Sequence, residues 1–163
     1  MTTLDVVREQ LLEILAGQGA RLPFEAAVAE FPDEAINRRP PNAGVTPWHI
    51  LEHIRFAQRD ILHYIRDRAY LAPAWPEEYW PAADATASPE MFAGTIAALR
   101  TDQRALHDIV ADPATDLLAT IPGTPGHTIR REIRILGDHN SYHIGEFAIL
   151  RQVMGTWPPG RKG

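Results

Sequence analysis

The chain of 163 residues contains no cysteine. Disulfide bonds, thiolate nucleophiles and cysteine-ligated zinc or iron–sulfur sites are therefore excluded. Any transition metal that binds must be held by His, Asp or Glu side chains. The sequence contains seven histidines, so imidazole ligands are available.

An excess of positive charge and a long apolar run are also lacking. The net charge is -5 with histidine neutral, which argues against nucleic-acid binding and against attachment to an anionic membrane surface. No apolar run is long enough to span a bilayer, and the first residues do not have the charged-then-apolar pattern of a signal peptide. We therefore expect a cytoplasmic protein with neither a nucleic acid nor a membrane as its partner.

Apolar residues recur at helical spacing along most of the chain, and no strand pattern is present. Hydrophobic residues make up 45% of the sequence and charged residues 23%, a balance typical of one globular domain with its own core. The predicted domain is residues 1–163. The predicted long helices cover residues 4–16, 47–68, 89–112 and 129–154. Gly17-Gln18-Gly19 is expected to stop the first helix. A short second piece at 23–31 is either separate or continues the first helix after a kink.

The predicted helices have well-formed ends. Thr46, Ser88 and Thr128 are suitable N-caps, and proline follows the first two at the first helical position. Gly155 is a suitable stop for the last helix. These signals predict an all-α four-helix bundle. A long connection at 71–87, rich in proline and aromatic residues, is expected to cap one end of this bundle, and this role is compatible with covering a site.

Two histidines four residues apart lie inside the last predicted helix. Positions i and i+4 share a helix face, and the apolar stripe of this helix places His143 at its centre and His139 at its edge. The helix at 47–68 brings His53, and with it His49 one turn earlier, towards its own apolar face. If these two helices are neighbours, three imidazoles meet inside the bundle.

Three histidine ligands with one open position are typical of a catalytic metal site. The candidate ligands are His53, His139 and His143, for a divalent metal such as Zn, Ni or Fe, which the ligand type does not distinguish. His49 is a candidate fourth ligand or an outer neighbour. The alternative is that these histidines are core residues paired with carboxylates.

Three carboxylates are candidates to orient an imidazole or to carry protons: Glu52, Asp60 and Glu146. Asp60 is closest to the line of His53 along its helix, and Glu146 is closest to the line of His139. A solvated helix surface is the alternative for each of them. Arg151 is expected either at the mouth of a pocket or extended into solvent at the end of its helix.

These residues resemble the DinB/YfiT-like superfamily. The resemblance rests on residues 46–54 (TPWHILEHI), on the long connection, and on residues 139–146 (HNSYHIGE), and Leu150-Arg151 and residues 154–159 extend it. It implies an up-down-down-up bundle, often dimeric, with a divalent metal held by His53, His139 and His143. Relatives commonly have Arg-Gly-Gln after the last histidine, whereas this chain has Ile144-Gly145-Glu146.

The resemblance implies chemistry on small molecules. Relatives with assigned activities include transferases and isomerases that use a low-molecular-weight thiol, and others resemble hydrolases. Three hypotheses follow for this chain: a metal-dependent S-transferase or hydrolase, a non-catalytic, stress-related bundle that binds a metal or a small ligand, and a structural helical dimer with packed histidines.

Overall fold

The computed structural model describes residues 2–160 and is helical throughout this range, apart from its connections. Its long helices are α1 (Thr3–Leu15), α3 (Pro47–Arg66), α4 (Pro89–Ala111) and α5 (Ile129–Met154). Shorter pieces are α2 (Phe24–Val28) and the 3-10 helices η1 (Asp33–Ala35) and η2 (Glu77–Tyr79). Residues 2–160 contain no strand, only an isolated antiparallel bridge between Thr120 and Thr128. The predicted all-α bundle is confirmed.

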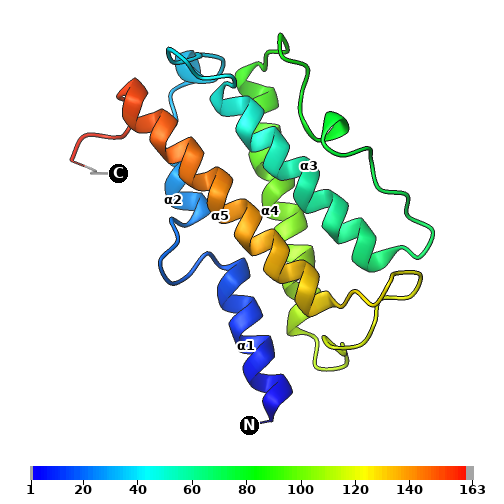
Figure 1. The fold of residues 1–163 in the computed structure, drawn as a ribbon. Coiled ribbons are helices and arrows are strands. Elements are labelled where there is room, and N and C mark those ends of the chain that lie inside the picture. The colour runs from blue at the N-terminus through cyan, green and yellow to red at the C-terminus, as the bar shows by residue number, and fades with distance from the viewer. Residues whose placement is uncertain (1, 161–163) are drawn as a thin grey trace.

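The four long helices form a bundle in which each packs against two others. α3 contacts α4 and α5, and α1 contacts the same two helices from the opposite side. In Figure 1, α1 and α5 rise while α3 and α4 descend. Because α3 and α5 are direct neighbours, the condition for bringing His53 towards the histidines of α5 is met.

Side-chain caps begin the helices where the sequence predicts them. Thr46 Oγ1 accepts a hydrogen bond from the backbone N–H of His49 at 3.2 Å, and Ser88 and Thr128 cap α4 and α5 in the same way. Gly155 ends α5 with a φ of 63°, a left-handed conformation that glycine adopts without steric cost. These ends fix where along α3 and α5 each histidine lies.

The segment after α1 decides between the two alternatives for residues 23–31. α1 ends at Leu15, and α2 is a separate short helix that packs against α5. Gly17 and Gly19 lie between them with φ values of 65° and 84°, and such residues turn the chain out of a right-handed helix. The predicted stop at Gly17-Gln18-Gly19 is confirmed, and the alternative in which residues 23–31 continue α1 after a kink is wrong.

Two apolar clusters fill the bundle, and α3 contributes to both. One gathers Ile50, Leu51 and Ile54 of α3 with Phe147 of α5 and residues of α2 and α4. The other joins the opposite end of α3 to α1, α4 and the first half of α5. His53 on α3 and the two histidines of α5 therefore lie on helices that pack against their neighbouring helices in both clusters.

Arg151 lies inside the protein, contrary to both expectations for it. Its side chain is completely buried, and its guanidinium donates hydrogen bonds to the carbonyl oxygens of Ala27 (2.6 Å), Ala29 (2.8 Å) and Thr156 (2.6 Å). The ring of Trp157 lies 4.3 Å from the guanidinium carbon. Arg151 thus joins α5 to the end of α2 and to the segment that follows α5.

No helix within residues 2–160 is both long enough and apolar enough to cross a membrane.

Candidate metal centre

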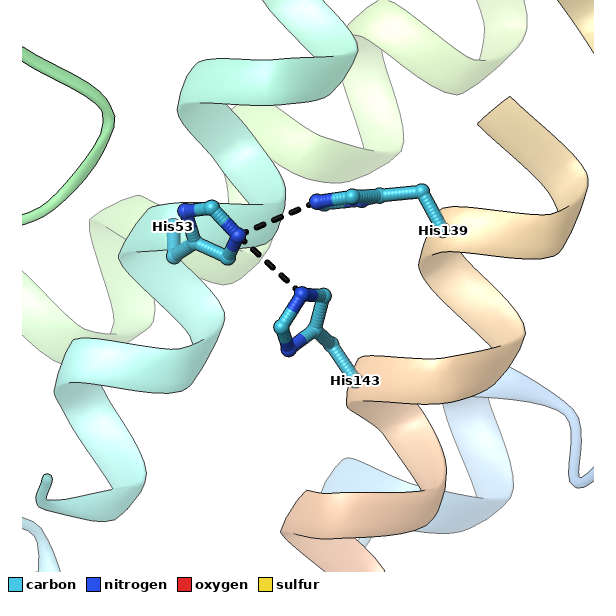
Figure 2. A group of neighbouring side chains, drawn as sticks. All are labelled: His53, His139 and His143. Atoms are coloured by element: carbon cyan, nitrogen blue, oxygen red, sulfur yellow. Dashed lines mark hydrogen bonds between the residues drawn. The ribbon is translucent and has the colours of Figure 1, made fainter. Parts of the chain in front are cut away.

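Three imidazoles from two helices meet at one point between α3 and α5 (Figure 2). His53 Nε2 lies 3.0 Å from His139 Nε2 and 3.1 Å from His143 Nε2. His53 and His143 are buried, and His139 is partly buried. Within residues 2–160 this is the group of histidines and carboxylates whose geometry suits a metal ion.

The other ring nitrogen of His53 is held by the backbone. Its Nδ1 lies 2.8 Å from the carbonyl oxygen of Tyr79. A carbonyl can only accept a hydrogen bond, so Nδ1 carries the proton. In the neutral ring Nε2 then has a free lone pair, and this lone pair points towards the two histidines of α5.

The two histidines of α5, like His53, have Nδ1 bonded to an acceptor outside the group. His143 Nδ1 donates to the Glu146 carboxylate at 2.6 Å, one turn further along the helix. His139 Nδ1 donates to the Oδ1 of Asn140 at 3.3 Å. All three rings therefore direct Nε2 towards a common centre and hold Nδ1 on an outer acceptor, the arrangement found around histidine-bound metals.

This arrangement fits a divalent metal better than hydrogen bonding among the rings. Neutral imidazoles protonated at Nδ1 have no proton on Nε2, so the contacts of 3.0 and 3.1 Å bring acceptors together. A cation between the lone pairs removes that repulsion. Tetrahedral coordination with metal–nitrogen bonds of about 2.05 Å separates ligand nitrogens by about 3.3 Å, so small rotations of the rings satisfy it.

The environment keeps these imidazoles neutral. Burial lowers the pKa of His139 to about 4, and neighbouring His143 and His53 add to this effect. Burial and His53 likewise lower the pKa of His143 to about 4. Burial also lowers the pKa of His53, against the opposing effects of the Tyr79 carbonyl and Glu146. Neutral imidazole is the form that binds a metal.

Glu146 has a pKa shifted in the opposite direction. Burial raises the pKa of its carboxyl group, and His53 partly counteracts this. The Glu146 side chain is nevertheless 41% exposed, so it connects the histidines to solvent. The structure places Glu146 against His143, not against His139, the histidine whose line it follows along α5.

The connection at 71–87 lies against two of the three histidines, His53 and His143. The Trp80 ring stacks on His53 with centroids 3.8 Å apart and planes 5° from parallel, and its edge faces His143 at 5.8 Å. Trp75 lies 6.2 Å from His53 and remains 63% exposed. Of the two compatible roles predicted for this segment, covering a site is the one that describes these contacts.

His49 lies outside the group because both of its ring nitrogens are occupied. Its Nδ1 pairs with the hydroxyl of Thr46, and its Nε2 lies 3.0 Å from the carbonyl oxygen of Ala82. The first contact completes the cap of α3, and the second attaches the far end of the covering segment to this helix. His49 is therefore placed as a structural residue and not as a fourth ligand.

The remaining candidate carboxylates do not contact an imidazole. Glu52 accepts hydrogen bonds from Thr95 at 2.8 Å and Arg55 at 2.5 Å. Asp60 interacts with the phenols of Tyr70 and Tyr79. Burial is the main cause that raises the pKa of Tyr70 to about 12, and the hydrogen bond with Asp60 adds to it. Asp60 therefore influences the site through Tyr79, whose carbonyl holds His53.

Two contributors to the site were not identified from the sequence. The carbonyl of Tyr79 has no signal of its own, since every residue has one, and its position depends on the path of the loop. Asn140 holds His139 and also donates from Nδ2 to Gln58 Oε1 at 3.0 Å. The signal that could have identified Asn140 is its position directly after His139 in α5, where it is partly buried.

Asn140 also borders the interior cavity. This cavity measures about 50 Å³ and lies between α1, α3, α4 and α5, with Gln58, Asn140 and Ser141 on its polar side. A volume of that size accommodates one or two waters. The three histidines do not line it, so the cavity is separate from the candidate metal centre.

A family model of the DinB superfamily matches residues 4–147. The match includes all three histidines and spans most of the chain, so the protein belongs to the DinB superfamily. No curated protein and no solved structure matches the chain significantly.

Proposed function

We propose that this protein is a divalent-metal-dependent enzyme that acts on a small molecule, with His53, His139 and His143 as the metal ligands. The observation that supports the proposal is the convergence of three Nε2 atoms whose partner Nδ1 atoms are each fixed by an acceptor. Packed core histidines need no such common direction. The ligand set accommodates Zn, Ni or Fe and does not select among them.

A divalent metal bound to three imidazoles lowers the pKa of bound water and activates a bound thiol or carbonyl. The chain contributes the rest of the chemistry. Tyr79, Asn140 and Glu146 hold the imidazole protons and so fix the ring orientations. Trp80 shields His53 on one side. Glu146, partly exposed and bonded to His143, is placed to pass a proton to solvent.

The favoured reaction is transfer to or from a low-molecular-weight thiol, with hydrolysis as the alternative within the same class. The chain has no cysteine, so a thiol must come from a cosubstrate. Turnover of an electrophile that requires added thiol supports the transferase. Turnover without thiol supports the hydrolase. We further propose a cytoplasmic homodimer, which the sedimentation behaviour of the purified protein tests.

A second candidate is a non-catalytic metal-binding protein. The stacking of Trp80 on His53 favours it, because the ring occupies one side of the site. The two candidates differ in whether a small ligand reaches the metal. Azide or thiol binding to a cobalt-substituted protein, followed by its visible spectrum, separates them: a changed spectrum supports the enzyme, and an unchanged one supports the closed binding protein.

Metal analysis of the purified protein tests the centre itself. One divalent metal per chain is expected in the native protein, with most of it lost in His53→Ala, His139→Ala and His143→Ala. His107→Ala is the matched control, because His107 is 55% exposed and lies on α4, away from the group. Equal metal content in all five proteins, or none in the native protein, contradicts the proposal.

A further inference from the structure

Two side chains of α5 that reach the surface contact His143. Tyr142 meets the His143 ring edge-on, at 4.8 Å and 88°, and is itself 66% exposed. Glu146 bonds His143 Nδ1 through Oε2, and its side chain is 41% exposed. Tyr142 and Glu146 are four residues apart on a helix, so they are neighbours on one face. An aromatic ring and a carboxylate therefore lie together beside a candidate metal ligand.

The charges around the candidate metal centre are negative or neutral. The charged or titratable groups that shift the pKa values of His53, His139 and His143 are those histidines themselves and Glu146, with no arginine or lysine among them. The covering segment 71–87 contains Glu77, Glu78 and Asp84 and no basic residue. A ligand with a carboxylate or phosphate finds no cationic partner at these positions.

We propose that Tyr142 and Glu146 form a subsite for a positively charged group, of the ammonium class, on the substrate or thiol cosubstrate. The inference rests on the proposed metal-dependent function and specifies its ligand. A cation is attracted both to the face of an aromatic ring and to a carboxylate. The Glu146 oxygen that does not bond His143 remains for this contact. The ligand is thus a small molecule whose reactive end enters the metal centre and whose other end is cationic.

The two ends of this ligand are complementary in charge to the two parts of the site. A metal held by the three imidazoles would bind the thiolate or another electron-rich end, while Glu146, one helical turn from His143, would contact the cationic end. An anionic group in place of the ammonium would face Glu146 and the π electrons of Tyr142, and both contacts are unfavourable. The expected order of affinity is therefore cationic, then neutral, then anionic.

Three thiols of matched size test this order on the cobalt-loaded protein. The cationic probe is thiocholine, whose quaternary nitrogen cannot itself coordinate the metal. Its neutral isostere is 3,3-dimethylbutane-1-thiol, and the anionic probe is 2-mercaptoethanesulfonate, whose sulfonate is a very poor metal ligand. Binding is followed by the cobalt absorption bands, and the measured quantity is the dissociation constant of each thiol.

Variants isolate the contribution of the subsite from the intrinsic acidity of the thiols. Glu146→Gln keeps an oxygen to accept from His143 and removes the charge. Tyr142→Leu keeps apolar area and removes the π face. Each is expected to reduce the preference for thiocholine over its isostere by about three- to tenfold. Asp138→Asn is the matched control: Asp138 is an exposed carboxylate on the same helix, but Arg134 already neutralises it at 2.9 Å.

The outcomes separate the inference from the function on which it rests. A thiocholine preference that falls in both subsite variants and persists in Asp138→Asn supports the subsite. An unchanged preference in Glu146→Gln and Tyr142→Leu overturns it while leaving the metal centre intact. Tighter binding of 2-mercaptoethanesulfonate than of the neutral isostere has the same meaning. Failure of the native protein to take up cobalt overturns the metal centre itself, and the subsite falls with it.

Discussion

His53 Nδ1 donates a hydrogen bond to the carbonyl oxygen of Tyr79 at 2.8 Å, and this bond joins a helix of the bundle to the segment that covers the site. The Tyr79 side chain is buried and interacts with Asp60, which lies about two turns after His53 on the same face of α3. Tyr79 therefore contacts α3 twice, once through its carbonyl and once through its phenol. The orientation of the His53 ring therefore depends on how firmly Tyr79 holds the segment 71–87 against α3.

We predict that Tyr79→Phe weakens metal binding by about tenfold, the lower end of the range for loss of an outer partner of a metal ligand. The variant retains the aromatic ring and the carbonyl, but the phenol no longer holds the carbonyl in place. A competition titration against a chromophoric chelator gives the metal dissociation constant.

Tyr70→Phe is the control for this prediction. It removes a phenol that interacts with the same Asp60 carboxylate. Tyr70 forms none of the hydrogen bonds that hold His53, His139 and His143. Its effect on the metal dissociation constant is expected to be less than about twofold, within ordinary surface variation. Equal losses in the two variants would show that Asp60, and not the position of the Tyr79 carbonyl, determines the affinity.

We predict that the metal-free protein loses stability as the pH falls from about 6.5 towards 4. Burial lowers the pKa of His139 and His143 from 6.5 to about 4 in the folded chain. Between these values the unfolded chain binds protons at both residues and the folded chain does not, so acid favours unfolding. Urea unfolding of the metal-free protein at pH 7.5, 6 and 5 measures the trend.

The variant His139→Gln/His143→Gln is the control for the pH dependence. It removes both groups with lowered pKa values, so the decline between pH 6.5 and 4 is expected to become shallower. Glu146, whose pKa is raised by burial, acts in the opposite direction, since the folded chain binds its proton more tightly than the unfolded chain. A decline of the same steepness in the double variant would assign the effect to other groups.

Much of the fold follows from local signals in the sequence. The caps at Thr46, Ser88 and Thr128 and the stop at Gly155 fix the long helices to within two residues, because each is a contact inside one helix end. The sequence also places the stop of α1 at Gly17-Gln18-Gly19, but it leaves open whether residues 23–31 continue that helix after a kink. The division of α1 from α2 depends on Gly17 and Gly19 adopting positive φ values, which glycine permits without requiring.

The candidate site shows the same division between local and long-range information. Helical spacing places His139 and His143 on one face, and the apolar stripe of α3 turns His53 inward. Contacts that depend on the path of a loop have no periodic signal, so neither the Tyr79 carbonyl nor the Ala82 carbonyl that occupies His49 was foreseeable. Arg151 was misplaced because its carbonyl partners lie outside α5, at the end of α2 and after α5.

We predict that Gly137→Ala destabilises the protein by about 1–3 kcal/mol, the usual cost of overpacking. A Cβ at position 137 would lie 2.2 Å from Cγ2 of Ile14, where α1 crosses α5. Ile14 is β-branched and has few alternative rotamers within a helix, so the helices must separate. Chemical denaturation gives the change in the free energy of unfolding.

Gly94→Ala is the matched control for the helix crossing. Gly94 lies within α4, and a Cβ there meets nothing within 4 Å. Alanine is favoured over glycine inside helices by up to about 1 kcal/mol, so this variant is expected to be stabilised. Destabilisation by both variants would mean that neither result reports the contact between Gly137 and Ile14.

We predict that Arg151→Met destabilises the protein by about 3 kcal/mol or more, the scale for breaking a buried polar network. The completely buried guanidinium satisfies the carbonyls of Ala27, Ala29 and Thr156, and methionine fills similar volume but leaves these acceptors without a donor. Arg151→Lys is expected to lie between Arg151→Met and the native protein, because one ammonium cannot reproduce the planar fork.

Arg100→Met tests whether loss of any arginine would have the same effect. Arg100 forms an ion pair with Glu25 at 2.6 Å, but both side chains are largely exposed, and exposed pairs contribute about 0–1 kcal/mol. Its free energy of unfolding should therefore stay within about 1 kcal/mol of the native value. Because Arg151 lies two turns beyond His143 on α5, metal content measured alongside stability shows how far the damage spreads. Retained metal in Arg151→Met would mean that the end of α5 can loosen without displacing the histidines, whereas loss of metal would mean that the anchoring of this end helps to hold them in place.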